Sequence, residues 1–344
     1  MARSGRAKSN DGNAVVVLVN CAGGRELEVV RDSLTHSWNT PTVLISHADL
    51  ASTAVSLDLG TGLLDIGGRR VRPAVVWIRH ASAAALVAQA QPAGSMAPLD
   101  AASWARLLEQ VTASTTAPLP GGTRVGPGQL VDAGRLGVMA PRTVVTTDVP
   151  AGVRQVGAPS AIVKTPDFRL FEPDRRAWPA CRPEIVDAGP GLPATGADLP
   201  PVTGLPAGRS RPVVVQEYVA HRRELRVYYL NGGICAFDVR KPDPASLWID
   251  PARVTVSHTD CPPEAEKAVR TMCAAWHLRY AAFDLLIRDT GETVFLEANP
   301  DGDWLWFERK ADWYGVSFMA AVMVRALFVQ VTSLGARADD YDSE

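Results

Sequence analysis

The sequence has few cysteines and no long run of apolar residues, and both absences narrow its class. Its five cysteines stand at no spacing typical of a zinc site or a disulfide framework, so we expect free buried thiols in a reducing cytoplasm. No apolar stretch approaches the roughly 20 residues that a membrane helix needs. No apolar segment of the signal-peptide type follows the basic N-terminus. We therefore expect a cytoplasmic protein without a membrane partner.

Strong charge of either sign is also lacking. Lys and Arg number 35 and Asp and Glu number 37, which gives a net charge of −2. Non-specific nucleic-acid binding depends on clustered positive charge, so we expect no nucleic-acid partner. Hydrophobic residues make up 47% of the 344 positions, which is enough for sizeable cores in two or three domains.

Strand-like apolar runs separated by a helical pattern predict a small α/β domain at the N-terminus. The residues from Val15 to Val19 predict a strand that is buried on both faces. A Pro- and Gly-rich stretch at 187–212 predicts a flexible linker or loop. The predicted organisation is a disordered tail (1–13), an N-terminal α/β domain (14–80), a helical connection (81–128), a central lobe (129–186), the linker (187–212), a C-terminal lobe (213–334) and a tail (335–344).

The segment AAFDLLIRDTGETVFLEANP predicts a hairpin that carries acidic side chains. If Thr290 and Gly291 close the turn, Asp284 lies opposite Glu297, and Asn299 projects from the same face. Phe283, Leu285, Leu296 and Ala298 then point to the other face. Opposed carboxylates repel unless a cation is present, and oxygen ligands favour Mg²⁺ or Mn²⁺ over zinc. The alternative is a polar, solvated face of an edge hairpin.

A second predicted hairpin surrounds Asn231, Gly232 and Gly233. With a three-residue loop, Arg226 opposes Asp238 and Glu224 opposes Arg240. With a two-residue loop, Phe237 and Val239 oppose them instead. We favour the three-residue loop, because it gathers the charged side chains on one face. Such arginines suit phosphate binding, although cross-strand ion pairing on a solvated face is the competing interpretation.

Lys164 and the aromatic residues after the acidic hairpin each allow a functional and a purely structural interpretation. Lys164 ends an apolar strand, where a lysine is usually solvated but can contact a phosphate. Trp304, Trp306, Trp313 and Tyr314 follow the acidic hairpin, and we expect core packing more than a peptide groove.

The order of these segments resembles the ATP-grasp ligases. A strand-end lysine is followed by a linker, by Gln-Glu-Tyr-Val, by Glu-Leu-Arg, and by Asp with Glu-x-Asn-Pro. The stretches FLEANPDGDWLWFE, VVWIRH and GQLVDAGRLGVMAPRTVVTTD are similar to those of graspetide (microviridin-type) maturases, which close rings in ribosomal precursor peptides. The resemblance covers roughly residues 15–330. It implies a mixed α/β and α+β fold, an ATP-grasp fold with a small α/β pre-ATP-grasp domain at the N-terminus. It also implies a precursor-peptide partner and a homodimer.

The resemblance also implies roles for individual residues. ATP and Mg²⁺ (or Mn²⁺) are the implied cofactors, with Asp284, Glu297 and Asn299 as metal ligands. Lys164 and Arg226 match phosphate-binding positions, and Arg240 matches a basic position near the reacting carboxylate, so Arg226 and Arg240 are the candidate catalytic residues. The implied adenosine contacts are Gln216, Glu217, Tyr218, Val219 and, for the ribose, Glu224.

One feature departs from the family pattern. A second nucleotide lysine usually precedes the helix at 129–136, and here Arg124 is the nearest basic residue. Three hypotheses follow: a peptide macrocycle ligase that joins Asp or Glu side chains to Ser, Thr or Lys; an ATP-grasp ligase acting on a free amino acid or small metabolite; and a non-catalytic nucleotide-binding protein.

Overall fold

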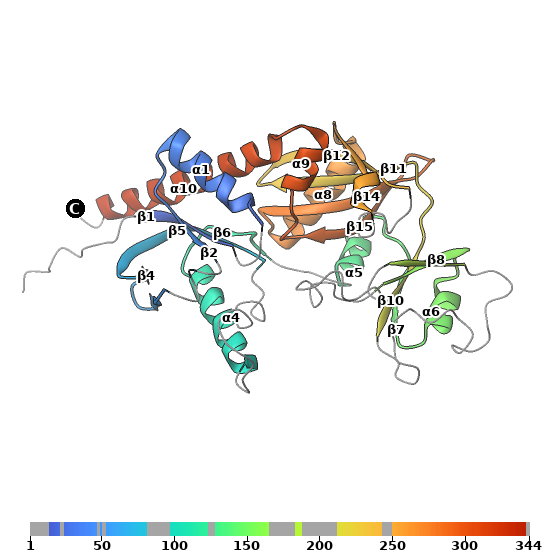
Figure 1. Cartoon of the computed structure of the whole chain (residues 1–344), viewed down its shortest axis with the longest axis horizontal. Helices are drawn as coiled ribbons and strands as arrows, with labels where there is room; N and C mark the ends of the chain where they lie inside the picture. Colours follow the sequence, from blue (N-terminus) through green and yellow to red (C-terminus); the bar gives the residue numbers. More distant parts are fainter. Residues whose placement is uncertain are drawn as a thin grey trace, which may run out of the picture. The chain divides into compact units, whose positions relative to one another are not determined.

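The computed structural model (Figure 1) describes residues 14–20, 24–46, 49, 53–80, 97–122, 128–164, 183–187, 212–242 and 250–341. The predicted tail at 1–13, nearly all of the predicted linker, and Arg124 lie outside these ranges. The chain divides into two compact units. One comprises Met1–Gly121, Asp303–Leu305 and Gly315–Glu344, and the other comprises Gly122–Gly302 and Trp306–Tyr314.

The first unit contains a sheet with strand order β2-β1-β5-β4-β3, with β6 also paired to β5. Strands β1, β2, β5 and β6 are parallel, and β3 and β4 add an antiparallel meander. The valines of β1 are fully buried on both faces, as the sequence predicts. Helices α1 and α10 pack on one side of this sheet and α4 on the other (Figure 1). The bounds are β1 (Ala14–Asn20), α1 (Glu26–Trp38), β2 (Thr42–Ser46), β3 (Val55–Asp58), β4 (Leu63–Ile66), β5 (Arg69–Arg79), α4 (Ala97–Ala113), β6 (Pro118–Leu119) and α10 (Gly315–Tyr341).

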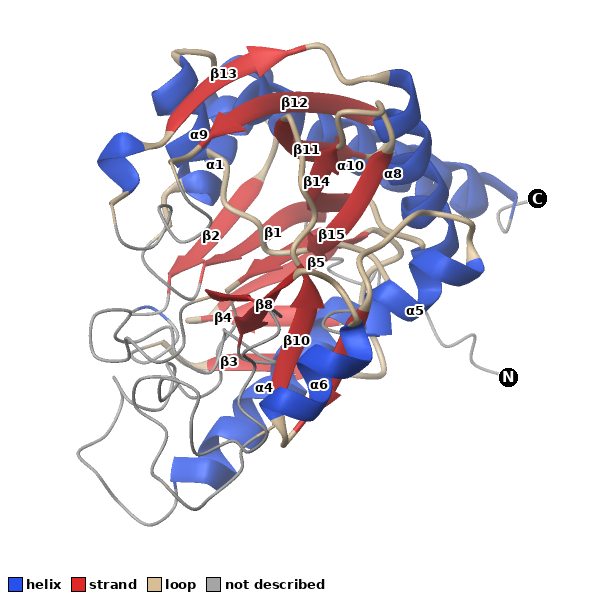
Figure 2. Cartoon of the chain, turned by 90° about the vertical axis from the view of Figure 1, so that its right-hand side faces the viewer, coloured by secondary structure: helices blue, strands red, loops and turns tan. Residues whose placement is uncertain are grey.

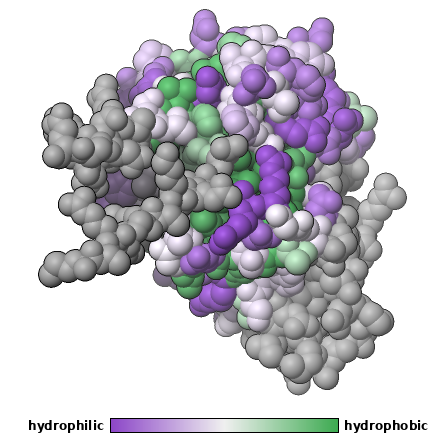
Figure 3. Space-filling view, turned by 90° about the vertical axis from the view of Figure 1, so that its left-hand side faces the viewer, coloured by the Kyte–Doolittle hydropathy of each residue, from purple (hydrophilic) through white to green (hydrophobic). Residues whose placement is uncertain are grey.

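Helix α10 differs from prediction in two ways. It belongs to the first unit rather than to a continuous C-terminal lobe, because its buried side packs against α1, β1 and β5. Its stretch Gly315–Leu334 is also long and apolar enough, by length and composition alone, to cross a membrane. The sequence reading missed this stretch because Arg325 interrupts it. Val316, Ala320 and Val324 are fully buried in the fold, and Figure 3 shows polar and apolar side chains interspersed on the face that it draws.

The second unit holds two antiparallel sheets. The smaller sheet has the order β7-β10-β8-β9, and its apolar core includes side chains of α6. Its elements are α5 (Gly128–Arg135), which precedes it, β7 (Thr143–Thr146), α6 (Val149–Val156), β8 (Ser160–Lys164), β9 (Glu184–Asp187) and β10 (Val213–Glu217).

The larger sheet has the order β13-β12-β11-β14-β15, and it is the curved sheet of Figure 2. One face packs against α8 around Val269, Met272 and Phe283. The other face carries five of the predicted site residues: Glu224, Arg226, Asp284, Glu297 and Asn299. The elements are β11 (Arg223–Leu230), β12 (Gly233–Arg240), a 3-10 turn (Pro251–Arg253), β13 (Thr255–Thr259), α8 (Pro263–Trp276), β14 (Tyr280–Ile287), β15 (Thr293–Asn299) and α9 (Leu305–Ala311).

Three cysteines lie in the described part of the chain, and all three are free thiols. Cys235 and Cys273 are buried, as expected, whereas Cys261 is partly exposed. Burial raises the pKa of Cys235 to about 12 and that of Cys261 to about 11, so both are protonated and weakly nucleophilic near neutral pH. Cys21 and Cys181 lie outside the described residues.

Candidate active site

In the acidic hairpin, the predicted pairing of Asp284 with Glu297 is confirmed. Asp284 on β14 lies opposite Glu297 on β15, and Asn299 lies opposite Ala282 on the same face. Two carboxylates and one amide oxygen therefore lie close together at the end of an edge strand. This donor set fits Mg²⁺, which binds through one or two carboxylates and completes its shell with water and phosphate oxygens. In the described part of the chain no group of three or more His, Cys, Asp or Glu side chains is placed to hold a metal ion.

The predicted turn of this hairpin was wrong, and a β-bulge compensates for the error. The backbone N–H of Arg288 donates to the carbonyl of Glu292 (3.0 Å), so the loop contains Asp289, Thr290 and Gly291. This loop shifts the pairing by one residue, so that Leu285 opposes Phe295. A register shift between Asp284 and Leu285 then restores the pairing of Asp284 with Glu297.

The bulge also reverses one side chain. Leu296 was predicted to share a face with Phe283 and Leu285, but it packs with Val219, Leu286 and Val294. Phe295 takes the place beside Phe283, with ring centroids 6.2 Å apart. The extra residue therefore preserves the apolar face against α8 while keeping Glu297 beside Asp284.

Arg226 on β11 pairs with the acidic hairpin rather than with β12. Its Nη1 donates to both carboxylate oxygens of Asp284, at 2.9 and 3.0 Å. The guanidinium lies over the rings of Tyr228 and Phe307, at 5.4 and 5.1 Å from their centroids. Burial alone lowers the pKa of Arg226, but Asp284 and Tyr228 outweigh it and hold that pKa well above its usual range. Arg226 is therefore a permanent cation beside a predicted metal ligand.

The favoured three-residue loop of the second hairpin was wrong. Leu230 pairs with Gly233, so Asn231 and Gly232 alone form the turn, and both have positive φ (48° and 103°). Asn-Gly is the preferred sequence for a two-residue turn of this twist. Arg226 consequently opposes Phe237, and Glu224 opposes Val239.

The charged partners around this hairpin follow from that register. Asp238 accepts from Arg223 Nε at 2.7 Å, on the face away from Arg226. Arg240 is largely exposed, and its Nε lies 3.9 Å from Asp238. Glu224 pairs with Lys241 at 2.8 Å, a partner that the sequence reading missed. Burial raises the pKa of Glu224 and Lys241 opposes that shift.

Lys164, at the end of β8, lies near enough to Glu297 for its charge to act on that carboxyl. Burial raises the pKa of Glu297, and Asp284 raises it further, whereas Lys164 and Arg226 lower it. Two neighbouring carboxyls that are partly buried favour a proton or a cation between them. The raised pKa of Glu297 is consistent with either.

The segment from Gln216 to Val219 leaves β10 and connects the two sheets. Gln216 is buried and its Nε2 donates to Thr143 Oγ1 at 3.0 Å. Glu217 accepts from the backbone N–H of Arg142 (3.2 Å). The backbone N–H of Tyr218 donates to Ser160 O at 3.0 Å, and Val219 is buried in the small cluster with Leu296.

Gln129 is a site residue that the sequence did not reveal. Its Nε2 donates to the carbonyl of Ala298 and its Oε1 accepts from the Ala298 N–H, each at 2.7 Å. Ala298 lies between Glu297 and Asn299 on an edge strand, so Gln129 satisfies backbone groups that no further strand pairs. Only a tertiary contact across 169 residues identifies this role.

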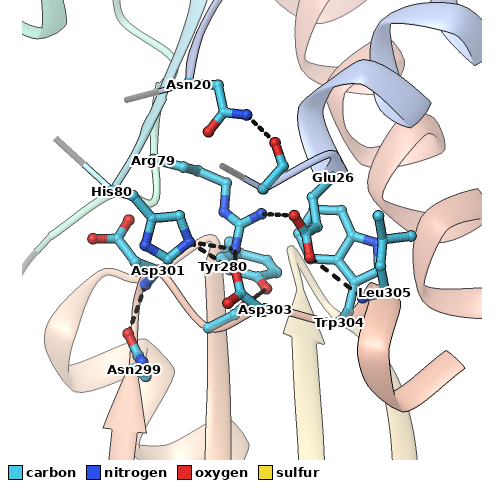
Figure 4. Close-up of polar contacts among 12 residues, drawn as sticks. Asn20, Glu26, Arg79, His80, Tyr280, Asn299, Asp301, Asp303, Trp304 and Leu305 are labelled. Atoms are coloured by element: carbon cyan, nitrogen blue, oxygen red, sulfur yellow. Dashed lines mark hydrogen bonds and ion pairs between the residues drawn. The ribbon is translucent and has the colours of Figure 1, made fainter. Parts of the chain in front are cut away.

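A second polar cluster lies in the first unit (Figure 4). Arg79 is fully buried over the ring of Trp304, at 4.6 Å, with Glu26 Oε2 at 3.6 Å and Asp303 Oδ1 at 3.0 Å. His80 Nε2 lies 2.7 Å from the same oxygen of Asp303. Arg79 and His80 belong to the VVWIRH segment, and this geometry shows that the segment carries a buried ion cluster.

The aromatic residues after the hairpin fall into two groups. In the first unit, Trp304 is fully buried, and its Nε1 donates to Ser317 Oγ at 2.9 Å, so the prediction of core packing is confirmed for it. In the second unit, Trp313 stacks on His258 at 3.8 Å and Trp306 lies against Phe307 at 4.9 Å. Tyr314 is 54% exposed and is not a core residue.

The fold is that of the ATP-grasp ligases, as comparison with solved structures shows. The ATP-grasp ligase PsnB, complexed with a phosphomimetic variant of a minimal precursor, Mg and ADP, superposes with a TM-score of 0.69 over 92% of this chain and 99% of its own, at 17% identity. The macrocyclase MdnC of Microcystis aeruginosa MRC, bound to precursor peptide MdnA, gives 0.67 over 91% and 99%, at 17% identity. D-alanyl-alanine synthetase A of Vibrio cholerae gives 0.51 over 93% and 99%, at 14% identity. No family model matches the sequence, and no curated protein matches it.

Proposed function

We propose that this chain is an ATP-dependent, ADP-forming ligase that closes ester or amide rings in a ribosomal precursor peptide. The observation that carries the proposal is the placement of Asp284 opposite Glu297, with Asn299 on the same face of the sheet. Arg226 also donates a hydrogen bond to Asp284. The similarity to PsnB and MdnC, whose structures contain precursor peptides, supports a peptide substrate.

In the proposed reaction, a peptide Asp or Glu carboxylate attacks the γ-phosphate of ATP and releases ADP. A Ser or Thr hydroxyl or a Lys amine then displaces phosphate from the acyl phosphate. Asp284, Glu297 and Asn299 would hold one or two Mg²⁺ ions, which would supply positive charge to the phosphate oxygens. Lys164 and Arg226 bind the same oxygens. Arg240, which the resemblance matched to a position near the reacting carboxylate, shares a strand face with Asp238 and not with Arg226, so it has no part in this scheme. Gln216–Val219 and Glu224 bind the adenosine.

No nucleophile on the enzyme is required by this scheme. Catalysis rests on positioning and on fixed charges that match the charge of the transferred phosphoryl group. We propose a cytoplasmic location for the protein, because the proposed reaction consumes ATP, which is available there. The homodimer remains a prediction, and light scattering on the purified protein measures it.

The test is mass spectrometry of a short peptide, rich in Thr or Ser and Asp or Glu, encoded beside the gene for this chain. Incubation with ATP and Mg²⁺ is expected to remove about 18 Da per ring, the mass of one water, with one ADP formed for each ring. Glu297→Gln is expected to abolish both products. Full ADP production by Glu297→Gln would show that the metal assignment is wrong.

A ligase acting on a free amino acid is the second candidate, because the fold is also similar to D-alanyl-alanine synthetase A. ADP formation with amino acids alone, and no mass loss from the peptide, would favour it. Tight ATP binding without ADP production from any substrate would instead favour a non-catalytic nucleotide-binding protein.

A further inference from the structure

Gly302 lies in the turn that follows β15, where any side chain would collide with Arg226. We infer that Gly302 is a positioning residue, which reserves the space that the Arg226 guanidinium needs beside Asp284. The inference rests on the proposed function, since it concerns the arginine assigned to the phosphates. Gly302 lies within the stretch FLEANPDGDWLWFE, but the resemblance assigned it no role.

The backbone around Gly302 is held firmly. The N–H of Gly302 donates to the carbonyl of Asn299 at 3.1 Å, and the N–H of Asp301 donates to Asn299 Oδ1 at 2.9 Å (Figure 4). The hydroxyl of the fully buried Tyr280 donates to the Gly302 carbonyl. The turn therefore fixes Gly302 relative to the predicted metal ligand Asn299, and it cannot shift freely to admit a larger residue.

The space at Gly302 is smaller than a methyl group. A Cβ there would lie 2.3 Å from Ala282 Cβ, 2.7 Å from Arg226 Nη2 and 3.2 Å from Asn299 O. Its backbone φ lies outside the left-handed region, so this glycine is needed for space and not for conformation. Of the two severe collisions, one is with a backbone-fixed methyl group and the other is with the end of a long side chain.

Arg226 has little room to yield. Its Nη1 is engaged by Asp284, its Nε lies 3.4 Å from Tyr228 Oη, and Phe307 covers its plane. A methyl group at 302 would push Nη2 away and break the alignment of Nη1 with Asp284. Because Asp284 is a predicted metal ligand, the displacement would disturb both the cation and the carboxylate that face the phosphates.

The experiment separates the two collisions. Ala282→Gly removes the methyl that Gly302→Ala would strike, so the double variant Ala282→Gly/Gly302→Ala keeps, of the two collisions under 3.0 Å, only the one with Arg226. Affinity for Mg·ATP is measured by calorimetry, and unfolding by urea, for the wild type, both single variants and the double variant. The same set is repeated in an Arg226→Met background, where the collision is absent.

The expected result is a double variant that unfolds near the urea midpoint of Ala282→Gly but binds Mg·ATP about 10- to 100-fold more weakly. In the Arg226→Met background the Ala282→Gly/Gly302→Ala pair is expected to have no further effect on affinity, which is the signature of coupling. Wild-type affinity in the double variant, or an equal loss with and without Arg226, would overturn the inference. Absence of Mg·ATP binding by the wild type would instead refute the proposed function.

Discussion

Arg226 donates from a single nitrogen to both oxygens of Asp284, across neighbouring strands of one sheet. The two residues are register partners, so this ion pair is set by backbone hydrogen bonds and not by flexible side chains. It places a permanent positive charge beside a predicted ligand of Mg²⁺. Both groups face the site proposed for the triphosphate.

Replacing Arg226 tests this arrangement. Arg226→Met leaves the Asp284 carboxylate, whose side chain is 26% exposed, without its cation, and we expect a loss of about 1–3 kcal/mol in the free energy of unfolding. ATP turnover is expected to fall at least about 100-fold, because the charge at the phosphates is removed. Urea unfolding and ADP release measure the two effects. Arg226→Lys, which keeps the charge, is the matched control and is expected to retain more of both; equal losses in the two variants would contradict the account.

Gln129 is expected to stabilise β15, the strand that carries Glu297 and Asn299, through its two hydrogen bonds to Ala298. Gln129→Ala leaves the N–H and carbonyl of Ala298 without these partners, at a cost of about 1–3 kcal/mol in unfolding free energy. We also expect a higher Mg²⁺ concentration for half-maximal ADP formation, because Glu297 and Asn299 flank Ala298. Val131→Ala on the same helix, where Val131 is 56% exposed, is the control and is expected to change neither quantity. An unchanged Mg²⁺ requirement in Gln129→Ala would limit the role of Gln129 to stability.

The strands of the larger sheet are largely predictable from the local sequence pattern, but the registers in which they pair are not. The pairing of Asp284 with Glu297 was correctly predicted from an incorrect turn, because a bulge at Leu296 cancels the extra loop residue. The pairing of Arg226 was wrong because charge grouping was weighed above the strong turn preference of Asn231-Gly232. Gln129 and Gly302 act through contacts between distant segments, and no local spacing reports those.

The buried cluster of the first unit predicts a large effect on stability. Arg79→Met leaves Glu26, which is 4% exposed, without its cation, and we expect the free energy of unfolding to fall by about 3–5 kcal/mol. Glu26→Gln combined with Arg79→Met is expected to recover part of this loss, because no uncompensated charge remains at Glu26. Thermal and urea unfolding measure both variants. A double variant that is less stable than Arg79→Met would show that Glu26 is not the group left unpaired.

The burial of Glu297 predicts a pH dependence in metal-free protein. Burial and Asp284 raise its pKa above the usual 4.5, so the folded state favours the protonated carboxyl. The stability due to this group is complete below pH 4.5 and is lost as the pH rises through the higher folded-state pKa. In EDTA, we expect the wild type to lose more stability than Glu297→Gln between pH 4.5 and neutrality. Parallel stability profiles for the two proteins would contradict the raised pKa.

The most direct test of the site is Mn²⁺ binding, followed by electron paramagnetic resonance with a non-hydrolysable ATP analogue present. The account predicts that Asp284→Asn combined with Glu297→Gln weakens Mn²⁺ binding at least about 10-fold. It predicts wild-type binding for Glu292→Gln, which changes a carboxylate at the end of the loop of the same hairpin. Equal Mn²⁺ affinity in the wild type and in the Asp284→Asn/Glu297→Gln variant would contradict the account. It would show that these two carboxylates do not bind the divalent metal that accompanies ATP.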